Sequence, residues 1–260
     1  MNDKEKTFFT AEELKFVDTT NLPFKYLMKC QLVKIRRFLW GRFFEKQPRR
    51  LVWGVREVSD VDGPNDNVRN YLERQIIRGV LKEITKENSF DNACEVGCGY
   101  GRVIMVLKEF AKNVVGFERE SHLVEIGRGL LPEIKFYNCN SIDNLRQYDK
   151  SLFDLVLTDT VLQHLTDEFC KKVLTEIKTI APQGYVLLIE KTEAIRVTKN
   201  IIDGNQFISI ARPVELYKEW MRPYELITTK PLILENTYSN KSPGTCMLFR
   251  SPNFGINKKS

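Results

Sequence analysis

From residue 93 onward, short apolar runs of strand length alternate with segments whose apolar residues recur at helical spacing. Five of the runs predict strands, at 93–97, 113–118, 134–140, 153–159 and 184–191. The segments between them predict helices at 101–112, 121–130 and 167–181, with Ser121 as the expected N-cap of the second. Because strands that alternate with helices are typical of a parallel sheet covered on both faces, we expect an α/β fold.

Two further strand-like runs, 232–239 and 244–251, are joined by the turn-rich stretch Asn-Lys-Ser-Pro-Gly. Such a link between strand-like runs predicts an antiparallel hairpin. The expected fold is therefore Rossmann-like, with a seven-stranded, mostly parallel sheet that ends in an antiparallel C-terminal hairpin.

Residues 1–65 differ from the rest and predict a helical, basic N-terminal lid ahead of a domain at 66–260. Between Lys25 and Arg50 there are nine basic residues and one acidic residue, although the net charge of the whole chain is only +6. Aromatic residues are mixed with these cations, which indicates amphipathic helices. A helix at 68–87, with Asn67 as its expected N-cap, follows a turn-forming stretch at 60–67.

The composition narrows the class of protein. With 260 residues and 42% hydrophobic content, the chain can bury one sizeable core. No apolar run of 18 residues predicts a transmembrane helix, and the first residues do not have the pattern of a signal peptide. The six cysteines form no C-x-x-C pair, so we expect reduced thiols and a cytoplasmic location. Two histidines argue against a zinc site, and we expect no bound metal.

The stretch Glu95-Val-Gly97-Cys-Gly99-Tyr-Gly101-Arg102 follows the first strand of the alternating pattern. A strand that leads into a glycine-rich turn and then a helix forms a ligand cradle at the carboxyl edge of a sheet, where bare backbone can approach the ligand. Dinucleotide sites use G-x-G-x-x-G/A, whose last small residue allows close helix–strand packing. Counted from Gly97, that sixth position is Arg102, which argues against a dinucleotide and hence against a dehydrogenase.

An acidic residue followed by G-x-G-x-G resembles the first motif of the class I S-adenosylmethionine-dependent methyltransferases. By the order of its elements, the resemblance covers roughly residues 90–250, while the motif matches are confined to a few short stretches. It implies S-adenosylmethionine as cofactor and S-adenosylhomocysteine as product. The positions that would lie against the amino-acid end of the cofactor are Glu95, Gly97, Cys98, Gly99, Gly101 and Arg102.

Three further stretches match that family in chain order. Glu118 ends the second strand, 21 residues after Gly97, where the resemblance implies a carboxylate that holds the ribose hydroxyls. At the end of the third strand it assigns the adenine to Asn140, Ser141 and Ile142; asparagine departs from the commoner aspartate but can still accept from the adenine amino group. After the fourth strand, the backbone around Thr158 and Asp159 would receive the methionine ammonium end. Taken singly, each of these residues also fits an ordinary strand end or turn.

A methyl acceptor that carries a hydroxyl or ammonium group needs a base near neutral pH. His164 follows the fourth strand, and the pKa of histidine suits this role, so His164 is the candidate catalytic residue. The alternative, weighed equally, is that His164 only packs or supports the site. We interpret the other histidine, His122, as structural.

The segment at about 191–212 is longer than a plain crossover and resembles an acceptor-side insertion. Within and after it, Phe207 and Tyr217 line either the acceptor pocket or the core, and Arg212 either pairs with an acidic acceptor or caps the fold. Glu190, at the end of the fifth strand, is a spare candidate for contacting substrate.

The functional hypothesis is O- or N-methylation of a small polar acceptor in a glycan, lipid-headgroup or secondary-metabolite pathway. The local basic charge makes an anionic or phosphorylated acceptor the first expectation. Two alternatives stay open: methylation of RNA or protein through the basic N-terminal region, although no RNA-reading motif is present, and an inactive cofactor-binding subunit. A basic amphipathic helix on a membrane surface is a further reading of that region. The oligomeric state does not follow from the sequence.

Overall fold

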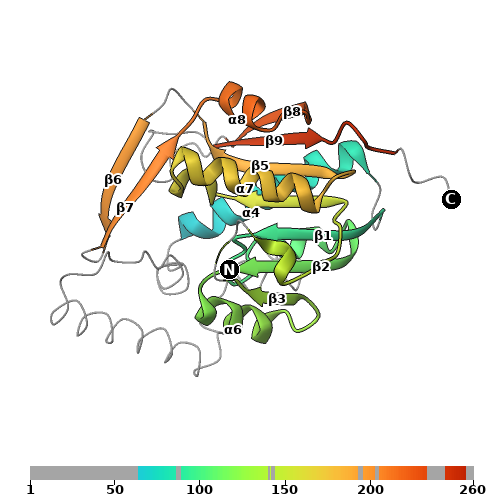
Figure 1. Ribbon diagram of the computed structural model, residues 1–260. Coiled ribbons are helices and arrows are strands. Elements are labelled where there is room, and N and C mark those ends of the chain that lie inside the picture. Colours follow the sequence, from blue (N-terminus) through green and yellow to red (C-terminus); the bar gives the residue numbers. More distant parts are fainter. Residues whose placement is uncertain are drawn as a thin grey trace.

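The computed structural model shows a seven-stranded sheet and a separate two-stranded hairpin (Figure 1). It describes residues 64–85, 89–139, 141, 144–192, 196–202, 205–232 and 244–255. The strands are β1 (Phe90–Val96), β2 (Ala111–Glu118), β3 (Lys135–Asn138), β4 (Leu155–Asp159), β5 (Tyr185–Lys191), β6 (Arg196–Ile202), β7 (Asn205–Ala211), β8 (Glu225–Leu232) and β9 (Gly244–Arg250). The helices are α4 (Pro64–Ile84), α5 (Ile104–Leu107), α6 (Ser121–Leu130), α7 (Asp167–Ile180) and α8 (Val214–Trp220), with 3₁₀ turns η3 (Leu145–Gln147) and η4 (Leu162–His164).

The strand order of the larger sheet is β3-β2-β1-β4-β5-β9-β8. Strands β1 to β5 are parallel, and β9 runs antiparallel to both of its neighbours. This confirms the predicted α/β, Rossmann-like sheet with an antiparallel C-terminal pair. The chain order reverses between β1 and β4, and open α/β sheets bind ligands in the crevice at such a switch point. We therefore expect a ligand at the carboxyl ends of β1 and β4.

Side chains alternate between the two faces of the sheet, and different helices cover each face. In β5, Leu187 and Ile189 belong to one hydrophobic core, whereas Val186 and Leu188 belong to the other. Helices α4, α5 and α6 contribute to the first core, and η3, α7 and α8 contribute to the second. Burial on both faces explains why these strands have nearly continuous apolar sequences.

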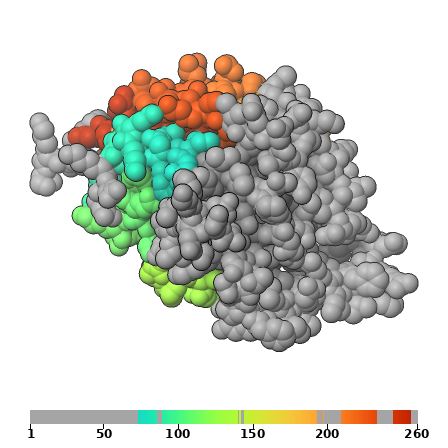
Figure 2. Space-filling view, turned by 180° about the vertical axis from the view of Figure 1, so that it is seen from behind, coloured from blue at the N-terminus to red at the C-terminus, as the bar shows by residue number. Residues whose placement is uncertain are grey.

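Helix α4 lies along the β8 side of the molecule, where Figure 2 shows it in cyan next to the orange and red C-terminal segments. Lys230 of β8 forms a 2.9 Å ion pair with Glu83 of α4. Arg78 of α4 binds Glu109 through two guanidinium nitrogens at 2.6–2.9 Å. These contacts attach α4 to the sheet and to the segment after α5. The predicted lid lies outside the described residues, apart from the two that begin α4.

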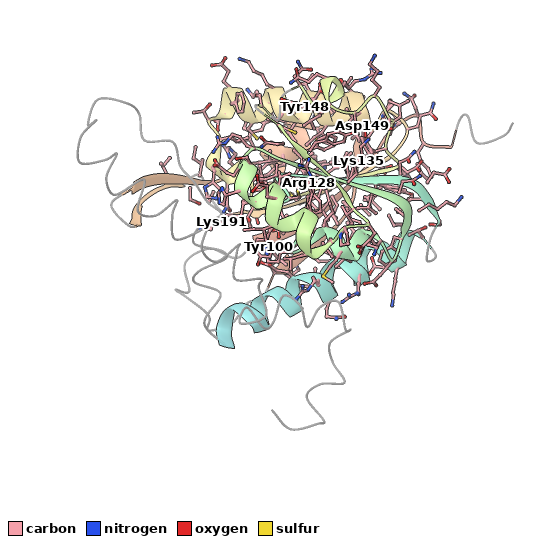
Figure 3. All side chains as sticks on the ribbon, turned by 90° about the horizontal axis from the view of Figure 1, so that it is seen from below. Tyr100, Arg128, Lys135, Tyr148, Asp149 and Lys191 are labelled. Carbon is pink, nitrogen blue, oxygen red and sulfur yellow. The ribbon has the colours of Figure 1, made fainter. Side chains whose placement is uncertain are left out.

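The hairpin β6–β7 follows β5 and extends away from the edge at which the parallel strands end (Figure 1). It occupies most of the predicted insertion at 191–212. Lys191, labelled in Figure 3, marks the end of β5 at the base of the hairpin. Strand β7 lies beside η4, so the hairpin reaches the turn that follows β4.

Two predicted boundaries between helix and strand were wrong. The helix expected at 101–112 is reduced to α5, and β2 begins at Ala111 rather than at residue 113. The reason is the register of the sheet: β1 extends back to Phe90, which pairs with Ala111, and the Phe90 N–H donates to Phe110 O at 3.0 Å. Residues 111 and 112 therefore belong to β2 because of strand pairing, although the local pattern predicts that they are helical.

The predicted helix starts also differ in detail. Helix α4 begins at Pro64, so Asn67 lies in its first turn and is not the N-cap; proline is well suited to a first helical position. Ser121 is the first residue of α6, and Glu120 occupies the N-cap position without a side-chain cap bond. By contrast, Thr166 caps α7 by accepting from Phe169 N.

Strand β8, at Glu225–Leu232, is the described partner of β9 in the C-terminal pair. The run predicted at 232–239 lies outside the described residues except for Leu232. Its register with β9 runs from Glu225 opposite Arg250 to Leu232 opposite Gly244. Within the described part of the chain, no helix is both long and apolar enough to cross a membrane.

Candidate functional site

The glycine turn after β1 has a backbone that other residues rarely adopt. Gly97, Gly99 and Gly101 have φ values of 76°, 56° and 99°. The N–H groups of Gly97 and Cys98 both donate to Phe117 O, at 2.8 and 3.1 Å, which fixes the turn against the end of β2. A Cβ at Gly97 would clash with Val161 Cγ2, so the turn also packs closely against the segment that follows β4.

Glu118 ends β2 and points back at the glycine turn. One carboxylate oxygen accepts from Gly99 N at 2.9 Å, and the other accepts from Glu120 N at 2.8 Å. The residue is only 8% exposed. Burial raises the pKa of Glu118, and the backbone hydrogen bonds partly oppose that rise. The structure thus brings together the turn and the carboxylate that the sequence places 21 residues apart.

Arg102 lies between two buried carboxylates. Its guanidinium forms an ion pair of 2.7 Å with Asp159, at the end of β4, and a second ion pair with Glu73 of α4. The side chains of Glu73 and Asp159 are almost fully buried. Arg74, also fully buried, donates to Arg102 O at 3.3 Å. Charged groups from α4 thereby enter the edge of the sheet between β1 and β4.

The carboxyl ends of β2 and β3 are tied together. Cys139 N donates to Glu118 O at 2.7 Å, and the Asn138 side-chain amide donates to Glu118 O and Arg119 O at 3.2 and 2.7 Å. Ser141 is half-buried just beyond this link. The other two residues predicted for the adenine, Asn140 and Ile142, lie outside the described residues.

The exit from β4 is strained. Thr158 is fully buried and Asp159 is nearly so, and Thr160 then has a φ of 56°. A β-branched residue in the left-handed region is a rare conformation that costs free energy and often occurs at functional sites. The Thr160 N–H donates to Ile189 O at 2.7 Å, which holds this turn against the end of β5.

His164 ends the 3₁₀ turn η4 and is half-buried. Its backbone N–H donates to Val161 O at 3.1 Å. The Gln163 amide nitrogen lies 2.9 Å from His164 Nε2. Which of the two donates depends on the tautomer of the ring and on the orientation of the Gln163 amide, whose oxygen is buried without a hydrogen-bond partner.

Glu190 and Arg212 bind the backbone of this turn. Glu190 accepts from the N–H groups of Val161, Leu162 and Gln163, and Arg212 donates to carbonyl oxygens of the same segment. Glu190, the spare candidate for contacting substrate, is thus fully buried, and each of its oxygens accepts from backbone N–H groups. Of the two roles considered for Arg212, the structure has the one that stabilises the fold.

The five described cysteines, Cys94, Cys98, Cys139, Cys170 and Cys246, are buried and free of disulfides. Burial raises the pKa of each thiol, to about 12 for Cys139, Cys170 and Cys246. Among the described residues no cluster of three or more His, Cys, Asp or Glu side chains is arranged to hold a metal ion. Lys135 and Asp149, both labelled in Figure 3, form an ion pair of 3.7 Å. Tyr137 donates from its hydroxyl to the same carboxylate at 3.1 Å.

Comparison with known proteins gives a consistent picture of this sheet. The family model of the methyltransferase domain matches residues 94–188, which run from β1 to β5. The part of the chain from β1 to β5 therefore matches a methyltransferase domain, which agrees with the expected class I superfamily. A SAM-dependent methyltransferase from Leishmania major has a similar structure, with a TM-score of 0.59 and 16% identity over 75% of this chain and 77% of that one.

The N-methyltransferase NodS from Bradyrhizobium japonicum, whose structure contains S-adenosyl-L-homocysteine, also resembles this methyltransferase domain. Its TM-score is 0.55 and its identity 16%, over 74% of this chain and 89% of that one. At such identities the likeness shows the shared fold. A 3′,5′-cyclic-AMP phosphodiesterase of Drosophila melanogaster, isoform F, is 30% identical over 84 residues. That segment is 32% of this chain and spans only 13% of the phosphodiesterase.

Within the methyltransferase domain, the predicted residues Glu95, Thr158 and Asp159 are buried next to the glycine turn and the strand ends. Glu73 was missed. The sequence pattern that could have indicated its burial is the spacing: Glu73 lies four positions before Ile77, so both fall on the buried face of an amphipathic helix. The roles of Glu190 and Arg212 had no comparable local signal.

Proposed function

We propose that this chain transfers the methyl group of S-adenosylmethionine to an oxygen or nitrogen atom of a small polar acceptor. The fold and the domain are those of S-adenosylmethionine-dependent methyltransferases, and NodS has S-adenosyl-L-homocysteine in its structure. The observation that carries the proposal is the contact between Glu118 and the glycine turn. This contact places a buried carboxylate and bare backbone at the same edge of the sheet.

The residues present fit such a cofactor. Glu118 would hold the ribose hydroxyls, since a carboxylate accepts two hydrogen bonds from neighbouring hydroxyl groups. The glycine turn, which has no room for a side chain at Gly97, would lie against the amino-acid end together with Glu95 and Cys98. Arg102 would bind the carboxylate of that end, with Asp159 beside it for the ammonium group. Thr158, Asn140, Ser141 and Ile142 complete the proposed site.

S-adenosylmethionine supplies an activated sulfonium methyl group when bound. The protein then has to orient the acceptor and remove its proton. We assign the proton to Nδ1 of His164, because a neutral imidazole accepts a proton on one ring nitrogen, and Nε2–H would then donate to the Gln163 amide oxygen. His164 is half-buried and follows the end of β4, in the turn η4. The hairpin β6–β7, beside η4, would border the acceptor.

Calorimetry tests the cofactor. We expect heat of binding with S-adenosylmethionine and S-adenosylhomocysteine and none with NAD or NADP. Replacement of Glu118 by alanine should weaken S-adenosylhomocysteine binding roughly 10- to 100-fold, as expected for loss of hydrogen bonds to a charged group. Glu215→Ala, on the exposed side of α8, is the matched control and should bind like the wild type. No binding of either sulfur nucleoside by the wild type would end the proposal.

The acceptor requires a separate test. Transfer of labelled methyl from S-adenosylmethionine should be measured with panels of small hydroxylated and amino compounds, each with and without a phosphate or carboxylate group. We expect the anionic members to be the better acceptors. Exclusive labelling of RNA or of protein would instead favour the macromolecular alternative.

A further inference from the structure

The turn η4 carries His164 but has little stability of its own. Its internal hydrogen bonds are those from His164 N to Val161 O and from Leu165 N to Leu162 O, both 3.1 Å. A 3₁₀ turn of three residues has poor hydrogen-bond geometry and cannot hold its shape alone. The remaining backbone groups of the turn need partners from elsewhere in the fold.

Glu190 binds the N–H side of the turn. Its Oε1 accepts from Val161 N at 3.1 Å and from Leu162 N at 2.9 Å, and its Oε2 accepts from Gln163 N at 3.0 Å. The side chain is fully buried at the end of β5. A buried acidic group that accepts three N–H bonds from consecutive residues fixes the start of the turn much as an N-cap fixes a helix.

Arg212 binds the carbonyl side. Its Nη1 donates to Leu162 O at 2.9 Å and its Nη2 to Leu165 O at 2.6 Å, while Nε donates to Asp167 Oδ1 at 2.8 Å. The guanidinium is also fully buried, directly after β7. An arginine has a rigid planar set of donors, so these three bonds define the position of the turn relative to α7.

We propose that Glu190 and Arg212 are positioning residues, which together hold η4 so that the His164 ring keeps the orientation needed to take a proton from the acceptor. Neither side chain is proposed to touch the acceptor. They come from the two ends of the β6–β7 hairpin segment, one from the strand before it and one from the loop after it. The assignment of the proton to His164 rests on the proposed function, but the restraint of the ring does not.

Because the chain has few histidines, NMR can measure the restraint of the His164 ring without an assay of enzymatic activity. The chain has two histidines, His122 and His164, so the ring signals in an NMR spectrum can be assigned with one His122→Asn variant. Glu190→Gln keeps the shape of the side chain but presents an NH₂ group to one of the N–H donors. Arg212→Lys keeps the charge but loses the planar donor set.

In both variants we expect the His164 signals to shift or broaden and the His164 pKa to change, while the His122 signals stay in place. We expect kcat to fall at least tenfold and KM for S-adenosylmethionine to change less than twofold. Two matched controls remove the same kinds of contact elsewhere. Glu176→Gln affects a carboxylate that accepts from Leu145 and Arg146 N in η3, and Arg78→Lys affects the pair with Glu109. Both controls should lose stability without a change at His164.

Unchanged His164 signals together with wild-type kcat in Glu190→Gln and Arg212→Lys would overturn the proposal. So would variants that lose cooperative unfolding and S-adenosylhomocysteine binding together, because the residues would then act on folding and not on the ring. If the wild type binds no sulfur nucleoside, the proposed function fails. The NMR comparison still decides whether Glu190 and Arg212 restrain the His164 ring.

Discussion

Arg102 and Asp159 form an ion pair of 2.7 Å that joins the residue after the glycine turn to the end of β4. Both side chains are largely buried, and Glu73 from α4 binds the same guanidinium. One guanidinium carries a single positive charge, so two buried carboxylates that share it are held by less than one full opposite charge each. A cofactor carboxylate that binds Arg102 would therefore compete with one of them.

The first prediction concerns this competition. Replacement of Glu73 by glutamine removes one anion from Arg102, so the protein should bind S-adenosylhomocysteine severalfold more tightly and unfold at a lower temperature. The control is Glu109→Gln, which removes the carboxylate bound to Arg78; Arg78 lies in α4, as Glu73 does. We expect no change in its affinity for S-adenosylhomocysteine. Calorimetry and thermal unfolding measure both effects. Weaker binding in Glu73→Gln would show that Glu73 supports the site.

The second prediction concerns the glycine turn. Gly97→Ala should destabilise the protein by at least about 1–2 kcal/mol, because Gly97 has a φ of 76° and a Cβ would clash with Val161. Cofactor binding should be lost as well. Urea unfolding and calorimetry measure these effects. Val161→Ala in the same chain should restore part of the stability by removing the clash, although the backbone cost remains. Equal stability of single and double variants would mean that the contact is not the cause.

The third prediction concerns the proposed base. His164→Ala should lower kcat by about 10²- to 10⁴-fold, the usual contribution of general base catalysis, and leave the affinity for S-adenosylhomocysteine unchanged. The rate of the variant should also lose the rise with pH that titration of a base produces. His122→Ala, in α6, is the control. Turnover like that of the wild type across the pH range would refute this role.

The fourth prediction concerns pH and stability. Burial raises the pKa of Glu190 to about 8 from an ordinary value of 4.5; the three N–H bonds oppose the rise and the charge of Asp159 adds to it. Between about pH 4.5 and 8 the unfolded chain therefore binds fewer protons at this site than the folded one. Stability should fall as pH rises through this range, by on the order of a few kcal/mol. Burial of Glu118 acts in the same direction.

Urea unfolding at pH 5 and pH 8 tests this linkage. Glu190→Gln cannot titrate, so its stability should fall less between the two pH values than that of the wild type. A wild type that becomes more stable from pH 5 to pH 8 by the same amount as the variant would contradict the raised pKa.

Local patterns predicted the elements that depend on local causes. Apolar runs separated by helical periodicity predicted β4 and β5, because strands buried on both faces must be apolar along their whole length. The predicted range of α6 is that of the structure, although Ser121 is not its cap. The boundary of α5 was wrong, because the pairing of Phe90 with Ala111 overrides the helical pattern before β2.

By itself, the sequence determined the class of fold, the glycine turn and the carboxylate of Glu118, since each depends on short-range periodicity or on a residue type with few conformational alternatives. The tertiary structure alone decided which charges meet. Glu73 reaches Arg102 across 29 positions, and Glu190 reaches Val161, Leu162 and Gln163 across 27 to 29. Such contacts have no local pattern, because the sheet order that brings β4 beside β1 and β5 is a property of the whole chain.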